Sequence, residues 1–162
     1  MIKEVTGDIL LTKAEVTAHG IAPMDDFKNG LALSIRERWP ALYKDFRHFC
    51  KTKSPKPGTL WTWGGADHTR IVNLMTQEPP AGNNDHPGKA KTKHVNHALK
   101  ELRKEIEKEG FKSVALPRLA TGVGGLDWDE VKPLIDEHLG DLDIPVIVYT
   151  EFHAGQQAEE GL

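Results

Sequence analysis

The 162-residue sequence has a single cysteine, little net charge and no long hydrophobic run. With only Cys50, it has no intrachain disulfide and no cysteine-rich zinc site, which is typical of a reducing compartment. The net charge of −3 provides no overall positive field for nucleic acid. Since no apolar stretch is long enough to span a bilayer and no signal peptide is recognisable, we expect a cytoplasmic protein without a membrane segment.

Strand-like and helix-like segments alternate along the chain, and no internal repeat interrupts them. Such alternation predicts an α/β domain with helices on both faces of a central sheet. We expect one domain over residues 1–152, followed by a polar, flexible tail at 153–162. Cys50 falls on the apolar stripe of a predicted helix, so we interpret it as a core residue. The predicted strands are 2–6, 15–19, 59–63, 70–75, 113–116 and 143–150, and the predicted helices begin near 31, 40, 92 and 127.

The segment from Leu116 to Trp128 contains three glycines within four positions, between a predicted strand and a predicted helix. Such a loop lets the backbone approach a ligand closely, and its N–H groups can surround an anion. The N-terminus of the following helix adds partial positive charge. The loop is neither the dinucleotide fingerprint nor the P-loop, so it predicts a phosphate site of another kind. The alternative is a tight connection that binds nothing.

Four polar or glycine-containing segments directly follow predicted strands. They are Asp8, the loop at 22–30, Gln77 and the loop at 119–125. Ligands of open α/β sheets bind outside the carboxyl ends of the strands. We therefore expect these segments to meet in one crevice.

These segments, taken in order, resemble the macrodomain family, which binds ADP-ribose. The resemblance rests on Gly7-Asp8-Ile9, Ala18 to Ala22, Lys28 to Ala32, and Leu116 to Trp128. It implies a three-layer α/β/α sandwich around a central mixed sheet. Within the family, Asn73-Leu74-Met75-Thr76 and Glu37-Arg38-Trp39-Pro40 are most similar to one branch. That branch contains terminal ADP-ribose protein glycohydrolase and the macrodomains of DNA ADP-ribosylation antitoxins.

The resemblance implies a role for each matching segment. Asp8 and the Ile9 N–H would hold adenine, the glycine loop would hold the diphosphate, and the loop at 28–30 would border the distal ribose. A stacking role for Phe152 on adenine and a place in the core are both open, and Asp8 has the alternative of a helix cap. The expected ligand-binding residues are Asp8, Ile9, Ala22, Asn29, Gly30, Leu31, Leu119, Ala120, Thr121, Gly122, Val123, Gly124 and Phe152.

The chain departs from that branch at three positions. Gln77 stands where a lysine is common, Gly124 where some members carry an acid, and Ala22 where many macrodomains carry an asparagine. A glutamine can orient a water or a hydroxyl, but it cannot form a Schiff base or act as a general base at neutral pH. The candidate catalytic residues are Gln77, His19 and Lys28. For His19 the alternative is a core histidine, and for Lys28 a solvated loop residue.

The resemblance implies a hydrolase that removes mono-ADP-ribose from acidic side chains or from nucleobases, with water attacking the distal ribose. Two alternatives are an ADP-ribose reader without turnover and a phosphatase acting on ADP-ribose 1″-phosphate. The expected partners are ADP-ribose, a mono-ADP-ribosylated protein or an ADP-ribosylated nucleic acid. We expect a monomer with no metal and no cofactor beyond this ligand.

Overall fold

A six-stranded mixed sheet forms the centre of the computed structural model, which describes residues 1–82 and 85–162. Neighbouring strands are parallel except for β3 and β4, which pair antiparallel at one edge. The α/β fold class predicted from the sequence is confirmed. In spatial order the strands are β1 (Ile2–Gly7), β6 (Val146–Phe152), β5 (Val114–Pro117), β2 (Val16–Ile21), β4 (Arg70–Met75) and β3 (Leu60–Gly64).

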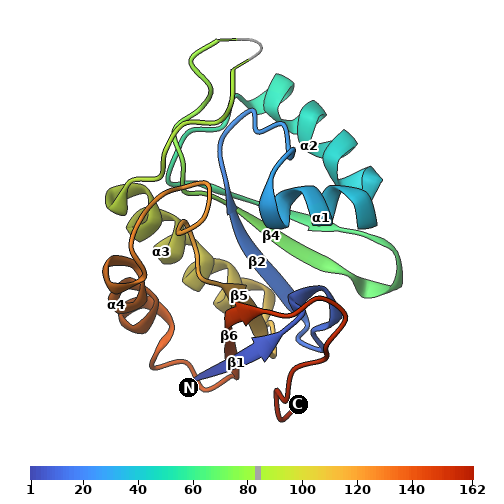
Figure 1. The fold of residues 1–162 in the computed structure, drawn as a ribbon, viewed down its shortest axis with the longest axis vertical. Helices are drawn as coiled ribbons and strands as arrows, with labels where there is room; N and C mark the ends of the chain where they lie inside the picture. The colour runs from blue at the N-terminus through green and yellow to red at the C-terminus, as the bar shows by residue number, and fades with distance from the viewer. Residues whose placement is uncertain (83–84) are drawn as a thin grey trace.

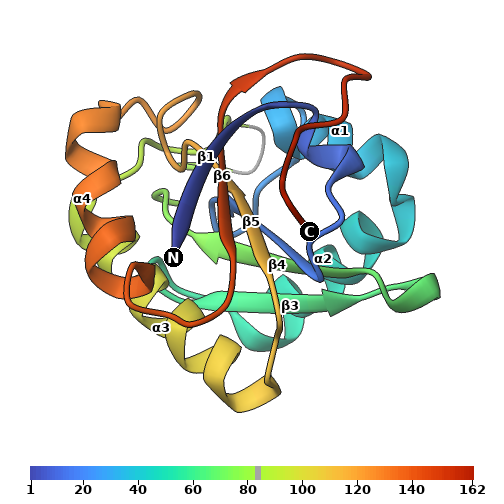
Figure 2. The ribbon, with the colours of Figure 1, turned by 90° about the horizontal axis from the view of Figure 1, so that it is seen from below.

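Helices cover both faces of this sheet (Figure 1). On one face lie α1 (Gly30–Arg38) and α2 (Pro40–Lys53), and on the other lie α3 (Thr92–Glu109) and α4 (Trp128–Leu139). The two helical layers stand on opposite sides of the strands when the molecule is viewed from below (Figure 2). This arrangement is the expected three-layer sandwich.

The two larger apolar clusters join the layers on opposite sides of the sheet, because side chains of successive strand residues point to opposite faces. Ala18 and Val72 face α3 and α4, whereas Ile21 and Ile71 face α1 and α2. Cys50 lies in the second cluster and is buried, as predicted. No helix of the described residues is both long enough and apolar enough to cross a membrane.

The C-terminal segment, expected to be a flexible tail at 153–162, lies against the start of the chain. The Asp8 N–H donates to Gln156 O at 2.7 Å, and the Gly155 N–H donates to Asp8 Oδ2 at 2.9 Å. Glu160 is buried, and its carboxylate accepts hydrogen bonds from the Tyr149 hydroxyl at 2.7 Å and the Lys13 N–H at 2.9 Å. Burial, together with the bond to Glu160, raises the pKa of Tyr149. The segment therefore has defined contacts with the rest of the fold, and its flexibility stays a prediction.

Candidate functional site

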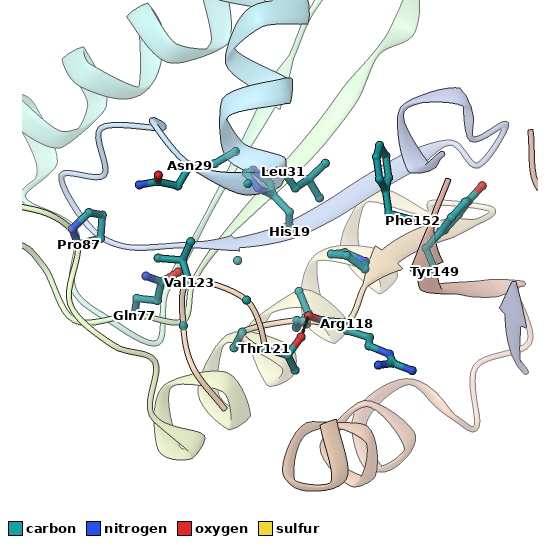
Figure 3. Close-up of a pocket in the computed structure, with 18 of the residues that line it drawn as sticks. His19, Asn29, Leu31, Gln77, Pro87, Arg118, Thr121, Val123, Tyr149 and Phe152 are labelled. Atoms are coloured by element: carbon teal, nitrogen blue, oxygen red, sulfur yellow. Dashed lines mark hydrogen bonds between the residues drawn. The ribbon is translucent and has the colours of Figure 1, made fainter. Parts of the chain in front are cut away.

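A cavity of about 300 Å³ opens where β2, β5 and β6 end (Figure 3). It brings together the start of α1, the glycine loop, Gln77 and the end of β6, which lie far apart in the sequence. The carboxyl ends of the strands therefore form one crevice. Of the residues predicted to bind ligand, those that line this cavity are Asn29, Gly30, Leu31, Leu119, Ala120, Thr121, Gly122, Val123, Gly124 and Phe152.

The glycine loop presents unpaired backbone N–H groups beside the cavity. Within the described chain, no N–H group of residues 121–124 donates a hydrogen bond to another residue. The loop is shaped by a turn in which Gly125 N–H donates to Gly122 O at 3.1 Å and by Ala120, whose φ of 63° is in the left-handed region. Consecutive free N–H groups at a cavity wall are suited to bind an anionic oxygen.

The N-terminus of α1 reaches the same cavity. Asn29 precedes the helix, and its side chain forms no capping hydrogen bond. Asn29, Gly30 and Leu31 all line the cavity. Since the first N–H groups of a helix have no partner within the helix, α1 adds a second set of donors and its partial positive charge. The electrostatics of this crevice therefore favour a negatively charged ligand.

Gly124 is packed too tightly to carry a side chain. A Cβ atom at this position would lie 2.6 Å from Ala120 O and 2.9 Å from the Ala90 Cβ. The Ala90 N–H also donates to Gly124 O at 3.0 Å, which ties the glycine loop to the segment at 77–91. An acidic side chain, which the resemblance led us to compare with this position, therefore has no room at Gly124 in this chain.

Gln77 is a buried residue whose side chain lines the cavity. Its Nε2 donates to Gly88 O at 2.9 Å, which fixes the orientation of the amide because a carbonyl oxygen can only accept. No described residue donates a hydrogen bond to Gln77 Oε1. This oxygen can therefore accept a hydrogen bond from a water or a hydroxyl in the cavity.

His19 also lines the cavity, but its ring is buried and neutral. Its Nε2 lies 2.7 Å from Asn73 Oδ1. Because Asn73 Nδ2 donates to Trp61 O and Ile71 O, Oδ1 must accept, and the proton of His19 is on Nε2. Burial lowers the pKa of His19 to about 4, against a smaller opposing effect of the Asn73 bond. A histidine that stays neutral at pH 7 fits the core interpretation better than a proton shuttle.

A second cavity of about 410 Å³ adjoins the first and shares Leu31, Tyr149 and Phe152 with it. Its walls are mainly apolar and include Ile9, as expected for a site that holds a flat ring. Phe152 is 60% exposed, so it is not a core aromatic and its ring is free to stack. The two cavities together offer a polar end and an apolar end to one elongated ligand.

Three of the predicted residues are not among those that line either cavity: Lys28, Ala22 and Asp8. Lys28 is exposed, and the Ala22 N–H donates to Asp25 Oδ2 at 2.9 Å. Asp8 caps a short 3₁₀ turn at Ile9–Leu11 by accepting from the Leu10 N–H at 3.0 Å. The capping alternative for Asp8 is therefore what the structure shows, and its contact with a purine stays a prediction.

The cavity also contains residues that sequence reasoning missed, among them Asp25 and Arg118. Asp25 is buried, and burial raises its pKa although the N–H groups of Ala22 and Phe27 bond to its carboxylate. In the sequence, Asp25 lies in a turn-rich loop like many surface aspartates. Only its burial in the structure distinguishes it from them. Arg118 directly follows β5, and that position was the one signal that pointed to it.

Known proteins resemble this chain in sequence and in fold. A family model described as the Macro domain matches residues 26–135. The chain is similar to the DNA ADP-ribosyl glycohydrolases of Thermus aquaticus, at 28% identity over 92% of this chain, and of Mycobacterium tuberculosis, at 25% over its whole length. It spans only 41% and 45% of the length of those relatives. The solved macrodomain of Thermus aquaticus DarG superposes with a TM-score of 0.80 at 27% identity, covering 93% of this chain and 98% of that one.

Proposed function

Since the chain belongs to the Macro domain family, we propose that it binds ADP-ribose and hydrolyses the bond between ADP-ribose and a nucleobase of DNA. The observation that carries the proposal is the row of N–H groups at residues 121–124 that have no partner among the described residues. These residues line the first cavity, and the apolar second cavity adjoins it. The relatives are named DNA ADP-ribosyl glycohydrolases. Their names favour DNA over the acidic protein side chains that the sequence also allowed.

The proposed binding mode follows the polarity of the two cavities. The diphosphate accepts hydrogen bonds from the glycine loop, with the N-terminus of α1 opposite it. Adenine lies in the apolar cavity against Phe152, and the distal ribose lies toward Gln77 and Asn29. The bond to be broken then lies at the end of the first cavity that is farther from Phe152.

The proposed reaction is attack of water on the anomeric carbon of the distal ribose. The bond from this carbon to the water oxygen forms as its bond to the nucleobase breaks, and the base stays in the DNA. Gln77 Oε1 accepts a hydrogen bond from the water or from a ribose hydroxyl and so sets its position. An amide does not take up the proton of the water, and His19 stays neutral, so a phosphate oxygen of the substrate accepts it, and the departing base takes up a proton from solvent. The N–H groups of the glycine loop hold that phosphate in place as the charge shifts.

The test is to incubate the protein with single-stranded DNA that carries one ADP-ribosylated base and to measure free ADP-ribose. Proteins ADP-ribosylated on glutamate serve as the competing substrate. We expect release from DNA, and we expect Gln77→Ala to slow that release while calorimetry shows ADP-ribose affinity within about threefold of the parent. Loss of rate without loss of affinity is the mark of a group that acts mainly in the transition state.

Two outcomes would refute this assignment in different ways. Tight binding of ADP-ribose without release from either substrate would establish a reader. The presence of Gln77 in place of a lysine and of Gly124 in place of an acid favours that alternative. Release from glutamate but not from DNA would keep the hydrolase and reject the nucleobase. Absence of ADP-ribose binding would reject the site itself.

A further inference from the structure

One short segment of this acidic protein carries a strong excess of positive charge. Residues 36–56 contain seven Lys and Arg residues and two acidic ones, a charge of +5, so the remaining residues carry −8. The segment covers the end of α1, all of α2 and the turn after it. We call these seven side chains the basic surface: Arg36, Arg38, Lys44, Arg47, Lys51, Lys53 and Lys56.

The cations of the basic surface are exposed and lack acidic partners. Six are exposed and Arg36 is half-buried. Among the described residues, none of the seven takes part in an ion pair, whereas Arg103 and Lys104 on α3 do. Asp45, one of the two acids in the segment, instead accepts a hydrogen bond from Trp63 Nε1 at 2.8 Å. Among the described residues, no acidic side chain therefore compensates the charge of this surface by an ion pair.

Three of the cations form a row along the outer side of α2. Leu42, Phe46 and Cys50 are the buried positions of this helix. Lys44, Arg47 and Lys51 follow the helical repeat on the opposite side. The row is about 10 Å long at 1.5 Å per residue, enough to face roughly three phosphates of a stacked nucleic-acid strand.

Arg36 and Arg47 are held in place by Tyr43 and by the loop beside the cavity. The guanidinium carbon of Arg36 lies 3.9 Å from the centre of the Tyr43 ring, and Arg47 Nη1 donates to the Tyr43 hydroxyl at 3.2 Å. Arg36 Nη1 also donates to Asp26 O at 2.8 Å, in the loop that leads to α1. Since α1 begins at the cavity, the basic surface starts within about two helical turns of the cavity wall.

We propose that the basic surface binds the phosphate backbone of the DNA strand whose modified base enters the cavity. The proposal rests on the proposed function and names the part of the protein that contacts its macromolecular substrate. Helices α1 and α2 lie together on one side of the sheet, so a strand leaving the cavity over Asn29 meets them first (Figure 1). The contacts are to phosphates, so they raise affinity and on-rate without selecting a base sequence.

The experiment compares two triple variants that change the net charge equally. The test variant is Lys44→Glu, Arg47→Glu and Lys51→Glu, and the control is Lys100→Glu, Lys108→Glu and Lys112→Glu, all exposed on or after α3. Affinity for an unmodified fluorescent single-stranded oligonucleotide is measured by anisotropy over a series of salt concentrations. ADP-ribose affinity is measured by calorimetry, and folding by thermal melting monitored by circular dichroism.

We expect the test variant to bind the oligonucleotide at least tenfold more weakly than the control at low salt. The slope of log affinity against log salt should fall in magnitude by about 2, since three phosphate contacts are lost. ADP-ribose affinity should be the same in both, which separates this proposal from the proposed function. If the Glu variant does not fold, the alanine triple at the same positions replaces it.

Equal oligonucleotide affinity in the test and control variants would overturn the proposal. So would binding of polyglutamate as tight as that of an oligonucleotide of the same charge, because the surface would then belong to an acidic protein partner. The release of ADP-ribose from DNA is measured separately, so its failure would affect the proposed function and leave the oligonucleotide comparison valid.

Discussion

Replacing Gly122 with valine should block the cavity without disturbing the fold, whereas replacing Gly124 with alanine should disturb the fold. Both glycines belong to the same loop and line the same cavity. They differ in what a side chain would meet. A Cβ at Gly122 would have no heavy atom of the described residues beyond its chain neighbours within 4 Å, while a Cβ at Gly124 would meet Ala120 O at 2.6 Å.

The open space at Gly122 is where the proposed diphosphate lies. A valine side chain there occupies volume next to the free N–H groups of the loop, so ADP-ribose affinity should fall at least tenfold, or about 1.4 kcal/mol. The free energy of unfolding should change by less than about 0.5 kcal/mol, because the position is exposed and its φ is not in the left-handed region.

At Gly124 the backbone must shift before a methyl group can fit. Overpacking of this kind costs about 1–3 kcal/mol. The shift also threatens the hydrogen bond from the Ala90 N–H to Gly124 O, which ties the loop to the segment at 77–91. For a domain of this size, the midpoint of thermal unfolding should fall by about 2–4 °C per kcal/mol.

Urea unfolding and calorimetric titration with ADP-ribose, both applied to the two variants, test this contrast. The reasoning fails if Gly122→Val binds ADP-ribose with parental affinity, since the loop would then be only a turn. It fails equally if Gly124→Ala is as stable as the parent, since the crowding at that position would then have no consequence.

Three further predictions concern residues around the cavities. Asp8→Ala leaves the N–H groups of Leu10 and Gly155 without their acceptor, so urea unfolding should show a loss of about 1–3 kcal/mol in the free energy of unfolding. Calorimetry should show weaker ADP-ribose binding. Unchanged stability and affinity would mean that Asp8 neither stabilises the turn nor contacts the ligand. For His19, the folded pKa of about 4 lies below the unfolded 6.5, so the unfolded chain binds the extra proton and stability falls by up to about 3 kcal/mol as the pH drops from 6.5 to 4. His19→Gln should remove that part of the pH dependence in urea titrations, and an unaltered pH profile would mean that burial does not lower the pKa of His19. Glu160→Ala should lower stability by about 1–3 kcal/mol and speed proteolysis of the C-terminal segment; equal cleavage rates would show that the carboxylate is not its anchor.

The arrangement of strands and helices was accessible from sequence because it depends on local pattern. Val95, Leu99, Leu102 and Ile106 recur at the helical period and are all buried in α3. Gly110 ends that helix with a φ of 67°, the left-handed conformation that glycine adopts most easily. Hydrophobic periodicity and turn residues depend only on residues close in the sequence, so they predicted the helices, the strands and the fold class.

Details of the site were not accessible in this way, because they depend on partners distant in the chain. The Asp8 carboxylate accepts a hydrogen bond from the N–H of Gly155, 147 positions later, and that bond holds the C-terminal segment beside the end of the first strand. Likewise, His19 has its low pKa through burial, and it bonds to Asn73, 54 positions away, whose effect opposes that shift. The local sequence around Asp8 and His19 does not indicate either of these long-range contacts.

The sequence by itself determined that this chain is an α/β domain with a glycine loop after a strand, since strand alternation and glycine spacing are properties of consecutive residues. Only the tertiary structure decided which polar groups remain available to a ligand. Within the residues that the structure describes, it leaves the N–H groups of residues 121–124 and Gln77 Oε1 unpaired, while the Asp8 carboxylate is hydrogen-bonded and His19 is buried. The physical reason is that a hydrogen-bonding group is free or satisfied according to what the fold brings near it.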